Sequence, residues 1–270
     1  MIALFRTELM KQFRRPRTYV ALGTMVAVPI IITIALKLNP PGQGEGPDDL
    51  FFLSSSTGLI VPAASLVVMS RFLLIGVVSM FAGDAVASEA SWGNLRALLT
   101  RPVKRGRLLA AKLSVVGLMT VLATALILIS GLVAGVIAFG LHPLDIPFVN
   151  IHHSTGALLG DLVIAGVYVA WSLTGILTLG FMISTMTDSP GGAIGAAFGL
   201  YVTSAILDNI TAIGPIRNVL PTHYFDAWTR LFTGHANTGD MWRGALLQIP
   251  YALIFGGMAW WWFRRKDILS

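Results

Sequence analysis

Long apolar stretches separated by short polar segments dominate the chain. A helix needs about 20 consecutive apolar residues to cross a bilayer, and six stretches reach or exceed that length. We expect the spans at roughly 18–37, 58–83, 108–140, 157–187, 190–208 and 244–263. The third and fourth are longer than the bilayer requires, so they are expected to tilt or to project beyond it. The pattern predicts an all-α, polytopic membrane protein that forms one transmembrane domain over 1–270.

The first 17 residues predict an amphipathic helix. Ile2, Phe5, Leu9 and Phe13 share one stripe, and basic residues cover the rest of the surface until Pro16 ends the helix. Such a helix is expected to lie flat on an anionic leaflet. The alternative is a solubilising tail, which does not need the apolar stripe.

A second amphipathic segment falls within 209–243, which is too polar to span. Phe225, Trp228 and Phe232 follow a spacing of three and four residues. This spacing predicts a short helix that lies on or dips into the outer leaflet, and the alternative is a packed external loop.

Composition agrees with a membrane protein. Only 12% of the residues are charged and 55% are hydrophobic, whereas about a quarter of a soluble domain is charged. There is no cysteine, which excludes disulfides and thiolate metal sites. Polar and basic residues precede the first span, so we expect no cleavable signal peptide.

The placement of the basic residues predicts the orientation. Most of them fall in three segments, 6–17, 96–112 and 264–266, which alternate with weakly basic or acidic loops. Because Lys and Arg accumulate in cytoplasmic loops, both termini and the segment 84–107 are expected to be cytoplasmic, with the chain multi-pass in the cell membrane. The net charge of +6 therefore indicates membrane topology and no nucleic-acid partner.

One cytoplasmic stretch, "SEASWGNLRALLTRPVKRGRLL" from Ser88, looks like part of a soluble protein. Ser88 fits an N-cap and Glu89 the first turn of a helix, where an acid is favoured by the helix dipole. Trp92, Leu95 and Leu99 then form an apolar stripe, with Leu98 beside it, and Pro102 ends the helix. Such a helix either rests on the membrane or is bound by another protein.

This stretch also resembles a known family. The matching residues are Glu89, Gly93, Asn94, Leu95, Arg96, Leu98, Leu99, Pro102, Arg105 and Lys112. They are similar to the E-x-x-x-G-T-L-R-x-L-L-x-x-P-x-x-R signature of bacterial ABC-2 type permeases, the membrane subunits of ATP-binding cassette exporters, with a lysine just inside the third span. Asn94 replaces the usual threonine, and Trp92 precedes the glycine. The six-span layout is similar throughout, but only 84–112 is specific.

The resemblance implies a coupling helix that inserts into a cleft on a separate ATP-binding subunit. The contact residues it implies are Glu89, Trp92, Gly93, Leu95, Arg96, Leu98, Leu99, Pro102 and Arg105. Trp92, Leu95 and Leu99 would be the apolar anchors, and Glu89 and Arg96 would pair at the rim. ATP and Mg would be bound by that partner, with no cofactor in this chain. A second permease chain, identical or paralogous, and membrane lipids complete the expected partners, and the cargo would be a drug, a peptide antibiotic or a lipid-like amphipath.

Catalytic motifs are absent from the sequence. There is neither a G-x-x-x-x-G-K-[ST] phosphate loop nor an H-E-x-x-H motif, so we expect a permease subunit and no enzyme. The histidines fall in the predicted outer loops. His152 and His153 with Asp145 or Asp161 are the only metal alternative we weigh, and the expectation is solvated histidines and no metal.

Two features inside the spans remain open. Arg71 lies near the middle of the second span, where a charge costs about 2.5–3.5 kcal/mol. It either forms a structural ion pair, with Asp161 or Asp208 as candidates, or lines the substrate path. Gly191, Gly195 and Gly199 form a small-residue stripe on the fifth span, which suits a dimer contact or packing within the chain.

The alternative function is an ATP-independent membrane protein, either a secondary transporter or an assembly factor. An ion-coupled carrier is expected to bury acids near the middle of the membrane. Asp84, Asp145, Asp161, Asp188 and Asp208 all fall near the ends of the predicted spans, which counts against it.

Overall fold

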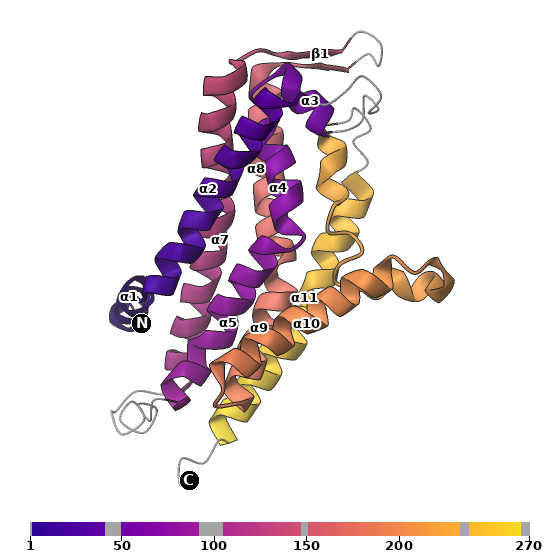
Figure 1. Ribbon diagram of the computed structural model, residues 1–270. Coiled ribbons are helices and arrows are strands. Elements are labelled where there is room, and N and C mark those ends of the chain that lie inside the picture. The colour runs from indigo at the N-terminus through magenta and orange to yellow at the C-terminus, as the bar shows by residue number, and fades with distance from the viewer. Residues whose placement is uncertain (1, 41–49, 92–104, 147–150, 233–237, 266–270) are drawn as a thin grey trace.

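The protein is an elongated bundle of helices (Figure 1). The structure is a computed structural model, and it describes residues 2–40, 50–91, 105–146, 151–232 and 238–265. The α-helices are α1 (Ile2–Phe13), α2 (Pro16–Leu38), α3 (Leu50–Ser56), α4 (Val61–Ser70), α5 (Leu73–Ser91), α7 (Arg105–Phe139), α8 (Thr155–Ser172), α9 (Thr174–Met186), α10 (Pro190–Asp208) and α11 (Thr238–Arg265). Two short 3₁₀ helices, η1 (Thr211–Val219) and η2 (Ala227–Leu231), lie between α10 and α11.

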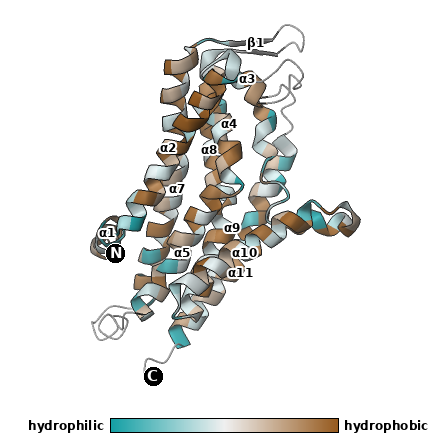
Figure 2. Cartoon of the chain, viewed as in Figure 1, coloured by the Kyte–Doolittle hydropathy of each residue, from teal (hydrophilic) through white to brown (hydrophobic). Residues whose placement is uncertain are grey.

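Six segments of the described chain are long and apolar enough to cross a membrane. They are Pro16–Leu38, Leu73–Ser91, Arg105–Phe139, Thr155–Met186, Pro190–Asp208 and Thr238–Arg265. Their number agrees with the sequence prediction, and the fifth has the predicted bounds. Hydrophobic residues run along the whole bundle, whereas hydrophilic residues gather at α1, near the C-terminus and on the segment that follows α10 (Figure 2). The chain is therefore a multi-pass helical membrane protein.

The second and fourth predicted spans are interrupted. Arg71 and Phe72 separate α4 from α5, so the span predicted over 58–83 is divided between two helices, and the one of spanning length is α5. In the fourth span Leu173 separates α8 from α9, but its N–H still donates to the Val169 carbonyl at 3.1 Å, which makes the interruption a kink. Hydropathy does not register either point because the residues on both sides are equally apolar.

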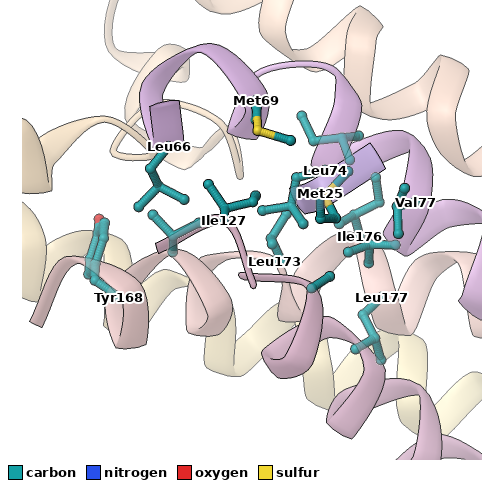
Figure 3. Close-up of a cluster of buried hydrophobic side chains, with 14 of the residues drawn as sticks. Met25, Leu66, Met69, Leu74, Val77, Ile127, Tyr168, Leu173, Ile176 and Leu177 are labelled. Carbon is teal, nitrogen blue, oxygen red and sulfur yellow. The ribbon is translucent and has the colours of Figure 1, made fainter. Parts of the chain in front are cut away.

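The core lies where these interrupted helices meet (Figure 3). Met25, Leu74 and Leu173 are 0% exposed and belong to one hydrophobic cluster. Met25 comes from α2, Leu74 from the start of α5 and Leu173 from the kink between α8 and α9. The kink at Leu173 therefore carries a buried side chain, which indicates that packing fixes it, whereas Arg71 and Phe72 at the break between α4 and α5 are exposed.

One element departs from the all-α prediction. β1 (Leu144–Ile146) and β2 (Ile151–His153) form a two-stranded antiparallel sheet between α7 and α8. It lies at one end of the bundle, which we call the hairpin end (Figure 1). The register places Asp145 opposite His152. Short strands were missed because three residues are too few for a periodic signal.

The opposite end of the bundle holds α1, the last turns of α5, the first turns of α7 and the last turn of α11, and we call it the basic end. The predicted helix over 1–17 is α1, and it ends at Phe13. Phe5, Leu9 and Phe13 are half-buried and pack against the hydrophobic core of the bundle. The apolar stripe thus faces protein at these three positions, whereas Ile2 is exposed.

The aromatic stripe between α10 and α11 also faces protein. Phe225, Trp228 and Phe232 are at most 5% exposed, and Trp228 contacts Phe232 edge-on with ring centroids 6.1 Å apart. These three side chains therefore pack against protein, which favours the packed alternative over a stripe that faces the leaflet. Similar spacing arises in both cases because each needs one apolar face.

Candidate functional site: buried ion pairs beside the 92–104 segment

The most unusual feature of the basic end is a group of buried charges that connects α1, α5 and α7. It lies where the chain leaves α5 at Ser91 and returns in α7 at Arg105. The predicted ATPase contacts Trp92, Gly93, Leu95, Arg96, Leu98, Leu99 and Pro102 lie outside the described residues. Glu89 and Arg105, the outermost predicted contacts, are described.

The structure corrects the predicted start of the coupling helix. Ser88 and Glu89 belong to the last turns of α5 and do not cap a new helix. The Ser88 hydroxyl donates to the Asp84 carbonyl at 2.7 Å, one turn earlier in the same helix. A serine followed by a glutamate looks the same at a helix start and within a helix, so the local pattern was misleading.

Glu89 is a buried member of a ring of four charged side chains. Glu8 of α1 binds Lys11 at 2.8 Å and Lys112 of α7 at 2.7 Å. Glu89 binds the same two lysines, at 3.0 Å and 2.8 Å. The Lys112 ammonium donates to Glu8 and, at 3.1 Å, to the Ala85 carbonyl, and it forms an ion pair with Glu89.

This geometry argues against the predicted role of Glu89 as a rim contact that pairs with Arg96. The side chains of Lys112 and Glu89 are 4% and 8% exposed, so both are withdrawn from the surface. A buried charge is tolerated when it is paired and hydrogen-bonded, and the ring provides two cations for two anions. Glu89 therefore belongs to the internal framework of the basic end.

A second ion-pair group lies one turn away. Asp84 is 1% exposed, and its Oδ2 atom accepts from Arg15 and Arg17 at the start of α2. Arg15 also donates to the Ser88 hydroxyl at 3.1 Å. The ring holds the last turns of α5 to α1. Asp84 holds the same part of α5 to the start of α2.

Sequence reasoning missed Glu8 and the partners of Asp84. One signal was present: Glu8 is the only acid before Glu45, and it stands among basic residues. Lys112 lies inside a predicted span and needs an acidic partner. Because Glu8 and Lys112 are separated by 104 positions, no spacing rule could join them.

Acidification is expected to release α1 from the bundle. Burial alone would raise the pKa of Glu8, but Lys112 and Lys11 outweigh burial and hold this pKa below the ordinary 4.5. Since the folded pKa is lower than the unfolded one, Glu8 stabilises the docked helix above pH 4.5 and loses this contribution as the pH falls through the folded value. Protection of α1 amides against hydrogen exchange, corrected for intrinsic rates, measures the release.

Alkaline release is expected only at much higher pH. Burial would lower the pKa of Lys11, but Glu8 and Glu89 outweigh it and raise this pKa above 10.5, so the contribution of Lys11 is lost only above that value. For the release of α1 by acid, Glu8→Gln is the control, and the hydrogen-exchange protection of its α1 amides should depend less on pH in the acid range. Equal protection of α1 at about pH 6 and about pH 3 would contradict the prediction.

The end of α11 packs beside the start of α7. Trp260 lies against Gly106, where a Cβ would fall 2.5 Å from the indole ring, so a larger residue would have to displace the indole. The Arg105 guanidinium donates to the Arg264 carbonyl at 3.3 Å, and Arg265 lies over the Trp261 ring at 4.4 Å. The start of α7, which follows residues 92–104 in the sequence, is therefore in contact with the end of α11.

Arg71 forms an ion pair, but with a partner that sequence reasoning did not name. Its Nε and Nη2 atoms donate to Asp226 Oδ2 at 3.2 Å and 2.8 Å. The proposed partner Asp208 instead binds His223, with 2.6 Å between Oδ1 and Nδ1. Asp226 lies just before η2, in a segment we expected to find outside the bundle.

The glycine stripe of α10 has no partner in the described part of the chain. A Cβ built at Gly191, Gly195 or Gly199 meets no atom within 4 Å. Packing within the chain therefore does not explain the stripe among the described residues. Figure 1 shows α10 running at an angle to the other helices of the bundle.

The described residues contain no group of three or more His, Asp or Glu side chains placed to hold a metal ion. Strand register pairs Asp145 with His152, and the side chains of Asp145, His152 and His153 lie outside the described part of the structure. The metal alternative therefore gains no support from the described part of the chain.

A bundle of six candidate spans with paired charges at one end defines a multi-pass membrane protein. Residues 50–269 match the family described as "Protein of unknown function (DUF2705)". The match covers most of the chain, so the protein belongs to this family. No curated protein matches the chain.

Proposed function

We propose that the protein is the transmembrane subunit of an ATP-binding cassette exporter, coupled to a separate ATPase subunit. The observation that supports this best is the braced attachment of the 92–104 segment. The helices on both of its sides, α5 and α7, are tied to each other and to α1 through Glu89 and Lys112. This segment carries most of the residues that resemble the permease signature.

A braced attachment is what force transmission requires. A segment that is moved by a partner passes this movement to the spans only if the helices to which it is attached are rigidly connected. The ion pairs of the ring connect α1, α5 and α7 next to residues 92–104. Movement of an ATPase subunit would then displace the inner ends of α5 and α7 together with α1. Such a rigid-body movement switches a cavity between two states without chemistry in this chain.

The proposed orientation places the basic end in the cytoplasm. The N-terminal helix, the ends of α5 and α7 that flank residues 92–104, and the end of α11 lie at this end (Figure 1), and most of the described Lys and Arg residues fall there. This distribution follows the positive-inside rule for the cell membrane. The ATPase would bind ATP and Mg on the same side, and lipid phosphates would contact the basic turn at 101–107.

The cargo we propose is a drug, a peptide antibiotic or a lipid-like amphipath, carried between two permease chains that are identical or paralogous. Two exposed features of α10 support pairing: its glycine stripe, and the large apolar side chains Leu200, Ile206 and Leu207. These exposed apolar side chains suit contact with either a second chain or lipid.

The docking of the ATPase is tested by co-purification with candidate ATP-binding subunits encoded beside this chain. Trp92→Ala and Leu95→Glu are each expected to lower the recovered ATPase about tenfold, as loss of a central apolar anchor does. Trp242→Ala, at an exposed tryptophan near the start of α11, is the control and should leave recovery unchanged.

Equal recovery with all three variants would show that the 92–104 segment does not bind the ATPase. Transport of cargo by the chain alone, in vesicles without nucleotide, would instead favour the ATP-independent alternative. Asp226 is the observation that keeps this alternative in view, because it pairs with Arg71 away from the ends of the bundle.

A further inference from the structure

The ion pair between Arg71 and Asp226 lies near the middle of the bundle. α4 begins at the hairpin end, where the Gly58 N–H donates at 3.1 Å to the Gly140 carbonyl just after α7. Arg71 follows Val61 by about 15 Å of helix and precedes Asp84 by about 20 Å, at 1.5 Å per residue. Because Asp84 marks the basic end and the hydrocarbon core is about 30 Å thick, Arg71 lies near mid-depth.

Both charges are exposed at this depth. The Arg71 side chain is 63% exposed and that of Asp226 40%. A charge facing lipid tails at mid-depth is strongly disfavoured, and such residues face a water-filled cavity or another chain. The exposed side of Arg71 therefore marks a surface that lipid tails do not cover.

Apolar side chains surround this charge. Phe72, next to Arg71, is 63% exposed and contacts Phe198 of α10 edge-on, with ring centroids 5.0 Å apart. Val68, one turn before on α4, is 44% exposed. A cationic group beside an exposed aromatic wall is complementary to a molecule with an acidic head and an apolar body.

The guanidinium of Arg71 has N–H groups that make no hydrogen bond to Asp226, whereas the second carboxylate oxygen of Asp226 is buried. Asp226 uses Oδ2 for both bonds from Arg71, and its Oδ1 atom is buried without a partner among the described residues. A guanidinium carries five N–H groups, and the bonds described for Arg71 use only Nε and Nη2. The remaining donors favour an added carboxylate or phosphate over an added cation.

We propose that Arg71 binds the acidic headgroup of an amphipath, whose apolar part packs against Phe72 and Val68. When no ligand is present, Asp226 accepts the hydrogen bonds of the guanidinium, and when the acid binds, the ligand accepts some of them instead. Arg71 thereby selects anionic amphipaths as cargo, and this inference rests on the proposed export function. The shared chemistry is an acidic group on an apolar body, from cargo or from a phospholipid.

The test measures binding of fluorescent dansylaminoundecanoic acid and of its methyl ester to the purified chain in phosphatidylcholine nanodiscs. The two probes share a tail and differ in charge, so their affinity ratio reports the headgroup contact, and ester binding reports an intact apolar wall. Wild type is expected to prefer the acid about tenfold, the worth of a charge-assisted hydrogen bond. Arg71→Gln should abolish the preference, and Arg71→Lys should reduce it because the lysine keeps the charge without the planar fork.

Further variants separate binding from structure. Asp226→Asn removes the competing carboxylate and is expected to tighten acid binding severalfold. The double variant Arg71→Gln/Asp226→Asn leaves no unpaired charge, so it replaces Arg71→Gln if that variant does not fold. Arg243→Gln is the matched control, since Arg243 is 71% exposed and lies 3.5 Å from Asp240.

Nanodiscs that contain phosphatidylglycerol distinguish the two sources of the acid. If this lipid lowers acid-probe binding in wild type but not in Arg71→Gln, the headgroup site accepts phospholipid; if it does not, the site is reserved for free amphipaths. Persistence of the acid preference in both Arg71→Gln and the double variant would overturn the proposal. Because the assay needs no ATPase, this failure is distinguishable from a failure of the co-purification.

Discussion

Replacing Lys112 with methionine is expected to destabilise the folded chain by about 3–5 kcal/mol, the cost of leaving a buried charge without its partner. In wild type the ammonium binds Glu8 at 2.7 Å and Glu89 at 2.8 Å, and it is 4% exposed. Methionine fills a similar volume but leaves two carboxylates with only Lys11 between them. The free energy of unfolding in mixed detergent micelles measures the loss.

Charge balance provides the control for this prediction. Glu89→Gln/Lys112→Met removes one charge of each sign and leaves the pair of Glu8 and Lys11, so it is expected to recover most of the lost stability. Lys37→Met changes an exposed lysine and should stay within about 0.5 kcal/mol of wild type. If the double variant were as unstable as Lys112→Met, the ring would not be the source of the effect.

Replacing Gly195 with leucine is expected to abolish the proposed pairing of two chains while leaving each chain folded. A side chain at this position meets no atom within 4 Å in the described chain, so it disturbs nothing there. In a partner packed against the stripe it would prevent the close approach that glycines permit. The chain has no native cysteine, so Thr203→Cys, one turn beyond Gly199, reports pairing by disulfide formation in native membranes.

We expect the cross-linked fraction to fall about tenfold when Gly195→Leu is added to the Thr203→Cys variant, because a leucine in a glycine contact separates the helices. Gly257→Leu is the matched control: it lies on α11 and likewise has open space around it. Gly180→Leu is the opposite control, since its Cβ would lie 3.0 Å from that of Ala82, and it should unfold the chain. Cross-linking that survives Gly195→Leu would place the contact between chains elsewhere.

The two amphipathic segments show what hydrophobic periodicity can predict about a structure. Their apolar stripes were predicted from the sequence, and the structure packs several of these side chains against protein. Phe5, Leu9 and Phe13 of α1 pack on the bundle, and Trp228 and Phe232 are buried. Periodicity identifies an apolar face, and it does not distinguish a lipid surface from a protein surface because both exclude water.

The candidate site was predictable only in part. The special character of the stretch from 84 to 112 is visible in its polar residues between apolar spans, and the resemblance to permeases rests there. The ring was not predictable, because Glu8 and Lys112 come together only when α1 docks on α7. Glu89 was assigned to a surface for the same reason: its sequence neighbours are polar, and its burial is decided by distant helices.

By itself the sequence determined the six candidate spans, the concentration of basic residues in three segments and the absence of cysteine and of a phosphate loop. These are local properties, because about 20 residues of sufficient hydropathy suffice to favour a helix in a bilayer. Only the tertiary structure decided where the helices break and which acid meets which base. Arg71 and Asp226 are 155 positions apart, and such pairs form where packing brings charges together in a medium that cannot solvate them singly.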